Sequence, residues 1–136
     1  MKTEIETALF DAVLAFQSDV YGNAISFPNV SFDQPEDGNF IEVIHAPNTT
    51  TNQVWDDGEA GFNQGFLRLL VHYPRNIGTV VPQQTVDQIL NYFPKGTKLP
   101  NGGITVKVYR PPWSNGAVVM DDERFIPVII PYQVEG

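Results

Sequence analysis

The fold of this chain is decided by one stretch, Gly65-Phe66-Leu67-Arg68-Leu69-Leu70-Val71-His72-Tyr73-Pro74. Apolar residues occupy every second position: Leu67, Leu69, Val71 and Tyr73. The alternate positions are mixed: Phe66, Arg68, Leu70 and His72. Successive side chains of a β-strand point to opposite faces, so we predict a strand over about 62–73, ended by Pro74. We expect its apolar face to meet helices, and its mixed face to be solvated or covered by another subunit.

Two segments repeat apolar residues at helical spacing, one before and one after this strand. The first begins near the N-terminus and contains Ile5, Leu9, Ala12, Val13 and Phe16. The second runs over about 81–93 and has a proline in its first turn, where proline is tolerated. Pro94 and Gly96 end the second segment.

Further strands are predicted over residues 39–45, 104–109 and 124–134, with a short one at 117–120. In the last of the long strands, Pro127 and Pro131 lack N–H groups on the same side, so we expect that side to form a sheet edge. The predicted order is α-β-β-α-β-β. This order favours an α+β fold, a mostly antiparallel sheet with two helices packed on one face, in a single domain over residues 1–136.

Residues 46–60 form the most polar window of the chain, which we interpret as a long loop between two strands. Such a loop is unusual in a small domain and is often functional. It contains Trp55, followed by Asp56 and Asp57. A second tryptophan, Trp113, follows a proline pair, and an aromatic residue in a loop is a candidate interface anchor or folds back onto its own domain.

The composition narrows the classes of function. Sixteen acidic residues against eight basic ones give a net charge of −8, the opposite of what phosphate binding needs, so we expect no sequence-specific nucleic-acid binding. The chain has no cysteine, which excludes disulfides, cysteine-ligated metals and a cysteine nucleophile. No segment has the length and apolarity of a membrane span, and the N-terminus lacks the layout of a signal peptide.

The sequence contains no recognisable catalytic arrangement. The two histidines, His45 and His72, lack the spacing and the additional ligands of a metal site. The acidic clusters at 56–59 and 121–123 are interpreted as solvated turns. We therefore predict no enzymatic activity, no cofactor and no metal.

Several stretches of the chain, taken together, have a recognisable order and spacing. The first is the N-terminal helix followed by Phe27-Pro28-Asn29-Val30 and the strand Phe40-Ile41-Glu42-Val43. The long strand that ends at Pro74 is the second. The others are Phe93-Pro94-Lys95-Gly96-Thr97, Val106-Lys107-Val108-Tyr109 and Ile126-Pro127-Val128-Ile129-Ile130-Pro131-Tyr132. In their order and spacing these stretches resemble the bacteriophage tail terminator proteins, and the resemblance extends over nearly the whole chain.

The resemblance implies a structural virion protein that forms a hexameric ring on the tail tube, ends tube polymerisation and offers the head-to-tail joining surface. The implied partners are further copies of the chain, the tail tube protein and a head completion or connector protein. The implied location is the head-proximal end of the virion tail, after assembly in the host cytoplasm. DNA would pass through such a ring, and acidic side chains lining it would repel phosphates.

A ring with head-to-tail contacts needs two different surfaces on each subunit. We expect one surface to be supplied in part by Phe66, Arg68, Leu70 and His72 with Arg124, and Trp113 is a further candidate contact. Trp55, Asp56 and Asp57 would reach the tube or a neighbouring subunit. Two alternatives stay open at this stage: a head–tail connector or neck protein, and a small ligand-binding or regulatory module whose polar loop covers a pocket.

Overall fold

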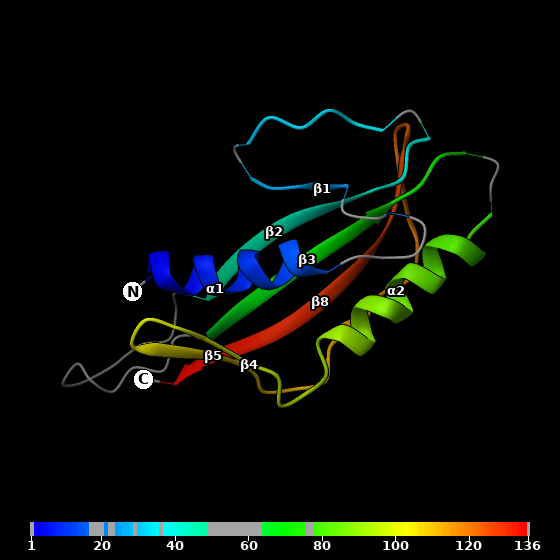
Figure 1. Cartoon of the computed structure of the whole chain (residues 1–136). Coiled ribbons are helices and arrows are strands. Elements are labelled where there is room, and N and C mark those ends of the chain that lie inside the picture. The colour runs from blue at the N-terminus through cyan, green and yellow to red at the C-terminus, as the bar shows by residue number, and fades with distance from the viewer. Residues whose placement is uncertain are drawn as a thin grey trace.

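Figure 1 shows a computed structural model of the chain, which describes residues 2–16, 21, 24–28, 30–35, 37–48, 64–75 and 78–135. The described residues form two helices and an eight-stranded sheet. In chain order the elements are α1 (Lys2–Ala15), β1 (Ile25–Ser26), β2 (Phe40–Asn48), β3 (Gln64–His72), α2 (Val80–Tyr92), β4 (Lys98–Asn101), β5 (Ile104–Val108), β6 (Trp113–Ser114), β7 (Val118–Met120) and β8 (Glu123–Glu135).

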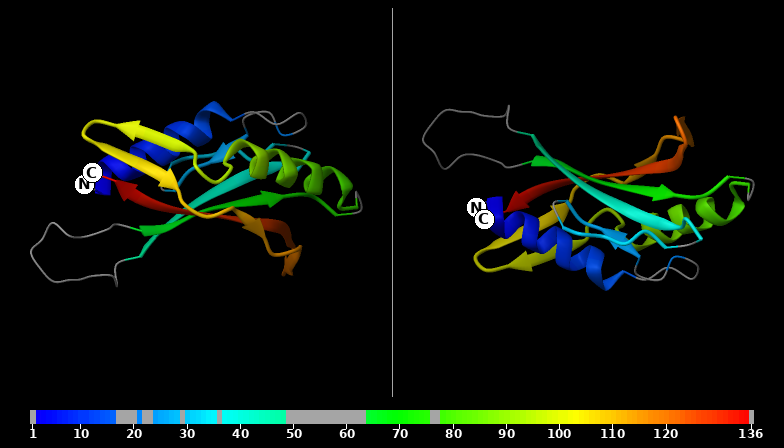
Figure 2. Two further views of the ribbon diagram at one scale, coloured as in Figure 1. Left: turned by 90° about the horizontal axis from the view of Figure 1, so that it is seen from below. Right: turned by 90° about the horizontal axis from the view of Figure 1, so that it is seen from above.

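Both helices lie on the same face of the curled sheet, as the two views of Figure 2 show. The predicted apolar face of β3 is confirmed, because Leu67, Leu69 and Val71 are each at most 1% exposed. They belong to one hydrophobic core with residues of both helices, among them Leu9, Val13, Val86 and Ile89. Burying a side chain of this size stabilises the fold by about 1.5–3 kcal/mol. The amphipathic patterns therefore predicted both the α+β class and the side on which the helices lie.

The sheet has the order β1-β2-β3-β8-β5-β4, and β6 and β7 also pair with β8. Only β1 runs parallel to its neighbour, β2, while every other described pairing is antiparallel. β3 pairs with β2 from Gln64 to His72 and with β8 over the same residues. The stretch that decided the prediction is thus an interior strand, paired along its whole length on both sides.

The prediction that the last strand has a free edge is wrong. β8 is paired with β3 on one side and, on the other, with three short strands: β7 at 123–125, β6 at 128–129 and β5 at 132–135. Pro127 accepts a hydrogen bond from the Ser114 hydroxyl on β6, so its backbone faces this second side. The two prolines fall between the three short strands. They divide this side of β8 into separate segments instead of leaving it unpaired.

The element order is confirmed for the longer elements and for the short strand predicted at 117–120, which is β7. Three further short strands add to it: β1, β4 and β6. The segment predicted as a polar loop at 46–60 begins inside β2, since Ala46, Pro47 and Asn48 pair with β3. The remainder of that segment, with Trp55, Asp56 and Asp57, lies outside the described residues.

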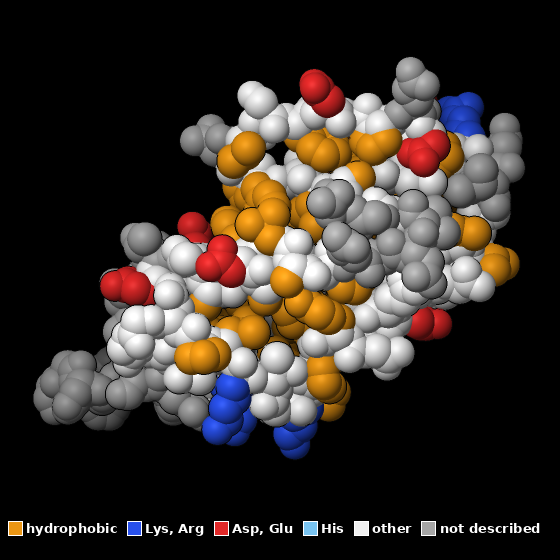
Figure 3. All heavy atoms as spheres, viewed as in Figure 1, with side chains coloured by type: hydrophobic (Ala, Val, Ile, Leu, Met, Phe, Trp, Pro, Cys, Tyr) orange, Lys and Arg blue, Asp and Glu red, His pale blue; other side chains and the backbone are white. Residues whose placement is uncertain are grey.

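The helix-bearing face is not uniformly polar. Figure 3 shows hydrophobic side chains in the gap between the two helices, with acidic side chains around the rim of the molecule. Neither of the helices in the described part of the chain is long and apolar enough to cross a membrane.

Candidate functional site

The first candidate site lies on the face of the sheet opposite the helices. Strand register places Ile44, Arg68, Ile129 and Trp113 side by side in one row across β2, β3, β8 and β6. Because side chains alternate along a strand, Phe66 and Leu70 share the face of Arg68. We call these residues the sheet patch: Ile44, Phe66, Arg68, Leu70, Trp113 and Ile129.

The sheet patch combines exposed aromatic rings with an arginine. Phe66 is 37% exposed and Trp113 is 40% exposed, and their rings meet edge to face with centroids 6.2 Å apart. Arg68 forms no ion pair with any of the described residues. Aromatic residues and arginine are the side chains most enriched at protein–protein contacts. The composition of the sheet patch is therefore that of a contact surface.

Four of the predicted contact residues come together here: Phe66, Arg68, Leu70 and Trp113. Two of them, Leu70 and Trp113, lie differently from what the sequence suggested. Leu70 is only 6% exposed, so it supports the patch from beneath. Trp113, expected in a loop, lies in β6 and is paired with Ile129 of β8.

Arg124 does not join the sheet patch. Arg124 lies just beyond Phe125, the last β8 residue paired with β3, and five positions before Ile129 of the patch. Its Nη1 atom is buried and makes no hydrogen bond within the described part of the chain. The expectation that Arg124 supplies part of one surface with Arg68 did not include the register between the two strands.

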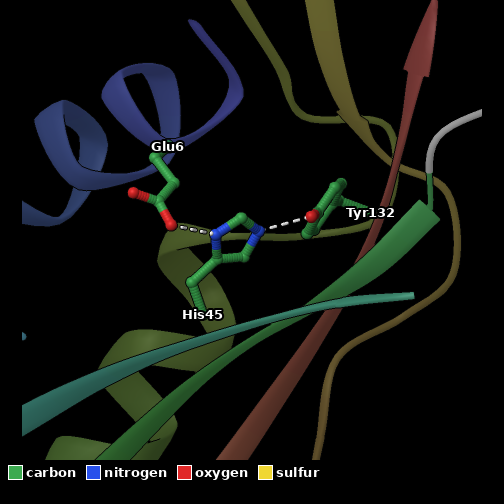
Figure 4. Close-up of polar contacts among 3 residues, drawn as sticks. All are labelled: Glu6, His45 and Tyr132. Carbon is green, nitrogen blue, oxygen red and sulfur yellow. Dashed lines mark hydrogen bonds and ion pairs between the residues drawn. The ribbon is translucent and has the colours of Figure 1, made fainter. Parts of the chain in front are cut away.

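A second polar cluster joins α1, β2 and β8, and Figure 4 shows its three members. The His45 Nδ1 atom lies 2.9 Å from Glu6 Oε2, and the His45 Nε2 atom lies 2.5 Å from the Tyr132 hydroxyl. An ionised carboxylate only accepts hydrogen bonds, so Nδ1 donates to Glu6 and the neutral ring accepts from Tyr132 at Nε2. The His45 side chain is 2% exposed, whereas that of Glu6 is 44% exposed.

The carboxylate–imidazole–hydroxyl order also occurs in hydrolases, but the environment of this cluster favours a structural role. Tyr132 is 1% exposed. Burial raises the pKa of its hydroxyl well above the ordinary value, and the nearby Glu6 carboxylate adds to the rise. A buried phenol that keeps its proton is a hydrogen-bond donor and a poor nucleophile. We infer that the cluster fastens α1 to the sheet.

Sequence reasoning missed this cluster, although a signal was present. His45 is in phase with Ile41 and Val43, which are each 1% exposed, so alternation already placed an imidazole on the buried face. A buried imidazole needs partners for both ring nitrogens. Tyr132 continues the buried even-numbered face of β8, and it lies opposite Gly65 of β3, where the missing side chain leaves room for its ring.

His72 belongs to a separate site at the other end of β3. Its ring stacks on Phe40 with centroids 4.3 Å apart, and its Nε2 atom lies 2.9 Å from Glu42 Oε1. These residues line a cleft of about 220 Å³ together with Arg124. His45 and His72 lie on opposite faces of the sheet. No three histidine, aspartate or glutamate side chains of the described ranges gather where they could hold a metal ion.

A solved structure of a protein with no stated function matches with a TM-score of 0.77 and 20% identity, covering 99% of this chain and 93% of that chain. At this identity the likeness shows the fold alone. No curated protein matches the sequence.

Residues 4–132 match the sequence family described as phage tail terminator protein. This match, over nearly the whole chain, defines a structural protein of the bacteriophage tail. The chain belongs to the phage tail terminator family, and its place is in the virion tail, in contact with other tail or head proteins.

Proposed function

We propose that this protein ends the growing tail tube. Six copies join in a ring on the head-proximal end of the tube, block the addition of further tube subunits, and present a surface to the head completion or connector protein. Assembly takes place in the host cytoplasm. The observation that carries this proposal is the family match over residues 4–132.

Two properties of the chain support a ring through which DNA passes. The sheet patch offers two exposed aromatic rings and a half-buried arginine to a neighbouring protein. The net charge of −8 is suited to a lumen, because acidic side chains repel the phosphates of passing DNA.

The described elements share one sheet and one hydrophobic core, which supports the proposal that residues 1–136 act as one domain. The role predicted for Trp55, Asp56 and Asp57 remains part of this proposal.

The test is assembly with the tail tube protein. Purified chain is mixed with polymerising tube protein, and the tubes are examined by negative-stain electron microscopy while native mass spectrometry measures the size of the free species. We expect sixfold rings at one end of the tubes, and tubes that become shorter as the ratio of this chain to tube protein rises. A Gly103→Ala variant, changed in an open exposed turn, is the matched control and should behave like the unaltered chain.

Two other outcomes would contradict the proposal. Binding to the head connector without any effect on tube length would indicate a neck protein. A strict monomer that ignores tubes and is stabilised against heat by a small molecule would indicate a ligand-binding module.

A further inference from the structure

The hairpin between β7 and β8 ends in a protruding tip, which we call the hairpin tip: Val119, Met120, Asp121, Asp122 and Glu123. β3 pairs with β8 only from Phe125 onward, so the tip extends past the end of β3. Val119 is 60% exposed and Met120 is 58% exposed, so the tip presents two neighbouring apolar side chains to solvent. Figure 1 shows this hairpin at the end of the molecule away from the first turn of α1.

An acidic side chain lies directly beside the apolar ones at the tip. Met120 and Glu123 are cross-strand partners, so their side chains are neighbours. Asp122 is engaged by Arg75, whose Nη2 atom lies 3.0 Å from its Oδ1. Glu123 is exposed and forms no ion pair with any described residue. The tip therefore presents an apolar group and an uncompensated carboxylate side by side.

The sheet patch presents the complementary pair of groups. Arg68 lies in the same cross-strand row as Trp113, and the Trp113 ring touches Phe66. An exposed aromatic surface thus adjoins a guanidinium without an ionic partner among the described residues. Apolar and charged groups match between the tip and the patch, and this match favours association between them over other partners.

One copy cannot make this contact with itself. Both surfaces are attached to β8, with Glu123 at its start and the patch residue Ile129 six positions further on, which at 3.3 Å per residue is about 20 Å of strand. The strand between them is paired with β3, which holds it extended. A tip and a patch that are complementary but separated in this way meet only between different copies. Repeated head-to-tail contacts of that kind close a ring when the rotations between successive copies add up to a full turn.

We propose that the hairpin tip of one copy docks on the sheet patch of the next, with Glu123 paired to Arg68 and Met120 packed against Phe66 and Trp113. This inference rests on the proposed ring and assigns the surfaces that form it.

The test uses charge reversal in two separate variants, Arg68→Glu and Glu123→Arg. Each variant alone brings like charges together at every contact, so ring formation on tubes should fall by about tenfold or more. An equimolar mixture should restore the rings. In a ring that alternates the two variants, half of the contacts join Glu at 68 to Arg at 123 and the other half join the native Arg68 to Glu123. Six is an even number, so such a ring closes.

Lys98→Glu is the matched control for Arg68→Glu. It makes the same change from a positive to a negative charge, but on β4, away from both surfaces, and should leave rings intact. Thermal unfolding checks that each variant folds. Single variants that form rings as well as the unaltered chain, or a mixture that stays as inactive as its components, would overturn the contact. If the mixture restores only a two-copy species and no ring, the assignment of this contact to the ring interface is overturned. If the unaltered chain forms no rings on tubes, the proposed function itself fails.

Discussion

Replacing Gly65 by alanine should destabilise this protein, because Tyr132 occupies the space that a Cβ atom needs. A Cβ at Gly65 would lie 2.6 Å from the Tyr132 hydroxyl oxygen, 2.8 Å from its Cζ atom and 2.9 Å from the Ala46 carbonyl oxygen. Neither the backbone of Ala46 nor the ring can move freely. Tyr132 is 1% exposed, and its hydroxyl is bound to the buried His45.

The magnitude has two parts. Overpacking in a core costs about 1–3 kcal/mol, and a displaced hydroxyl that leaves the His45 nitrogen unpaired costs a further 1–3 kcal/mol or so, about 2–6 kcal/mol together. Unfolding entropy is about 2.1 cal/mol/K per residue, or about 0.29 kcal/mol/K for 136 residues. The expected fall in Tm is therefore roughly 7–20 °C.

Thermal unfolding followed by circular dichroism measures this difference, and urea titration at 25 °C gives the free energy of unfolding directly. Gly103→Ala is the matched control, since nothing lies within 4 Å of its added methyl group and its Tm should shift little. Equal Tm values for the two variants would refute the close approach of Tyr132 to Gly65 and the tight cluster built on it.

Tyr132→Phe should lower the free energy of unfolding by about 1–3 kcal/mol in urea titrations, because it leaves the buried Nε2 atom of His45 without a partner; an unchanged midpoint would contradict the bond. Burial also raises the pKa values of Tyr21 and Tyr132 above their ordinary value near 10. As the pH rises, the unfolded chain loses these two protons before the folded chain does. The stability that the two tyrosines contribute is therefore fully present below pH 10 and falls above it by about 1.4 kcal/mol per pH unit for each tyrosine. In urea titrations between pH 8 and 11, the free energy of unfolding of Tyr132→Phe should fall less steeply with pH, because one of the two tyrosines is gone. Leu67→Ala should lower the free energy of unfolding of the isolated chain by about 2–5 kcal/mol, because the Leu67 side chain is 0% exposed. Phe66→Ala should lower it by about 1 kcal/mol or less, because Phe66 is 37% exposed. Similar losses for the two variants in thermal unfolding would contradict the assignment of the two faces of β3.

Much of the fold could be predicted because local periodicity and burial agree in the long elements. The alternation around Leu67 and the helical stripe around Ile89 each indicate one buried face, and the structure buries both. The partners of a strand are harder to predict, because they depend on register between distant segments. Pro127 and Pro131 removed N–H groups, but the sequence did not show that three short strands would pair between and beside them.

The same limit applies to the candidate contact residues. Phe66 and Arg68 belong to one strand, so their shared face followed from alternation alone. Arg124 lies on another strand, where a shift of one residue reverses the face of the side chain. The Glu6–His45–Tyr132 cluster joins residues 39 and 87 positions apart along the chain, and no local pattern brings such groups together.

The two prolines of β8 also affect what the chain can pair with before its folding is complete. While the full-length chain refolds, β8 can pair with β3 before the short strands β5, β6 and β7 pair with its second side. Its second side would then be a long apolar strand edge, the kind of surface on which other chains add as extra strands. Pro127 and Pro131 remove donors from that edge at intervals of four residues, so no incoming strand can form a continuous ladder on it. The two prolines that divide this side of β8 in the folded sheet thus protect partly folded chains from aggregating through that edge.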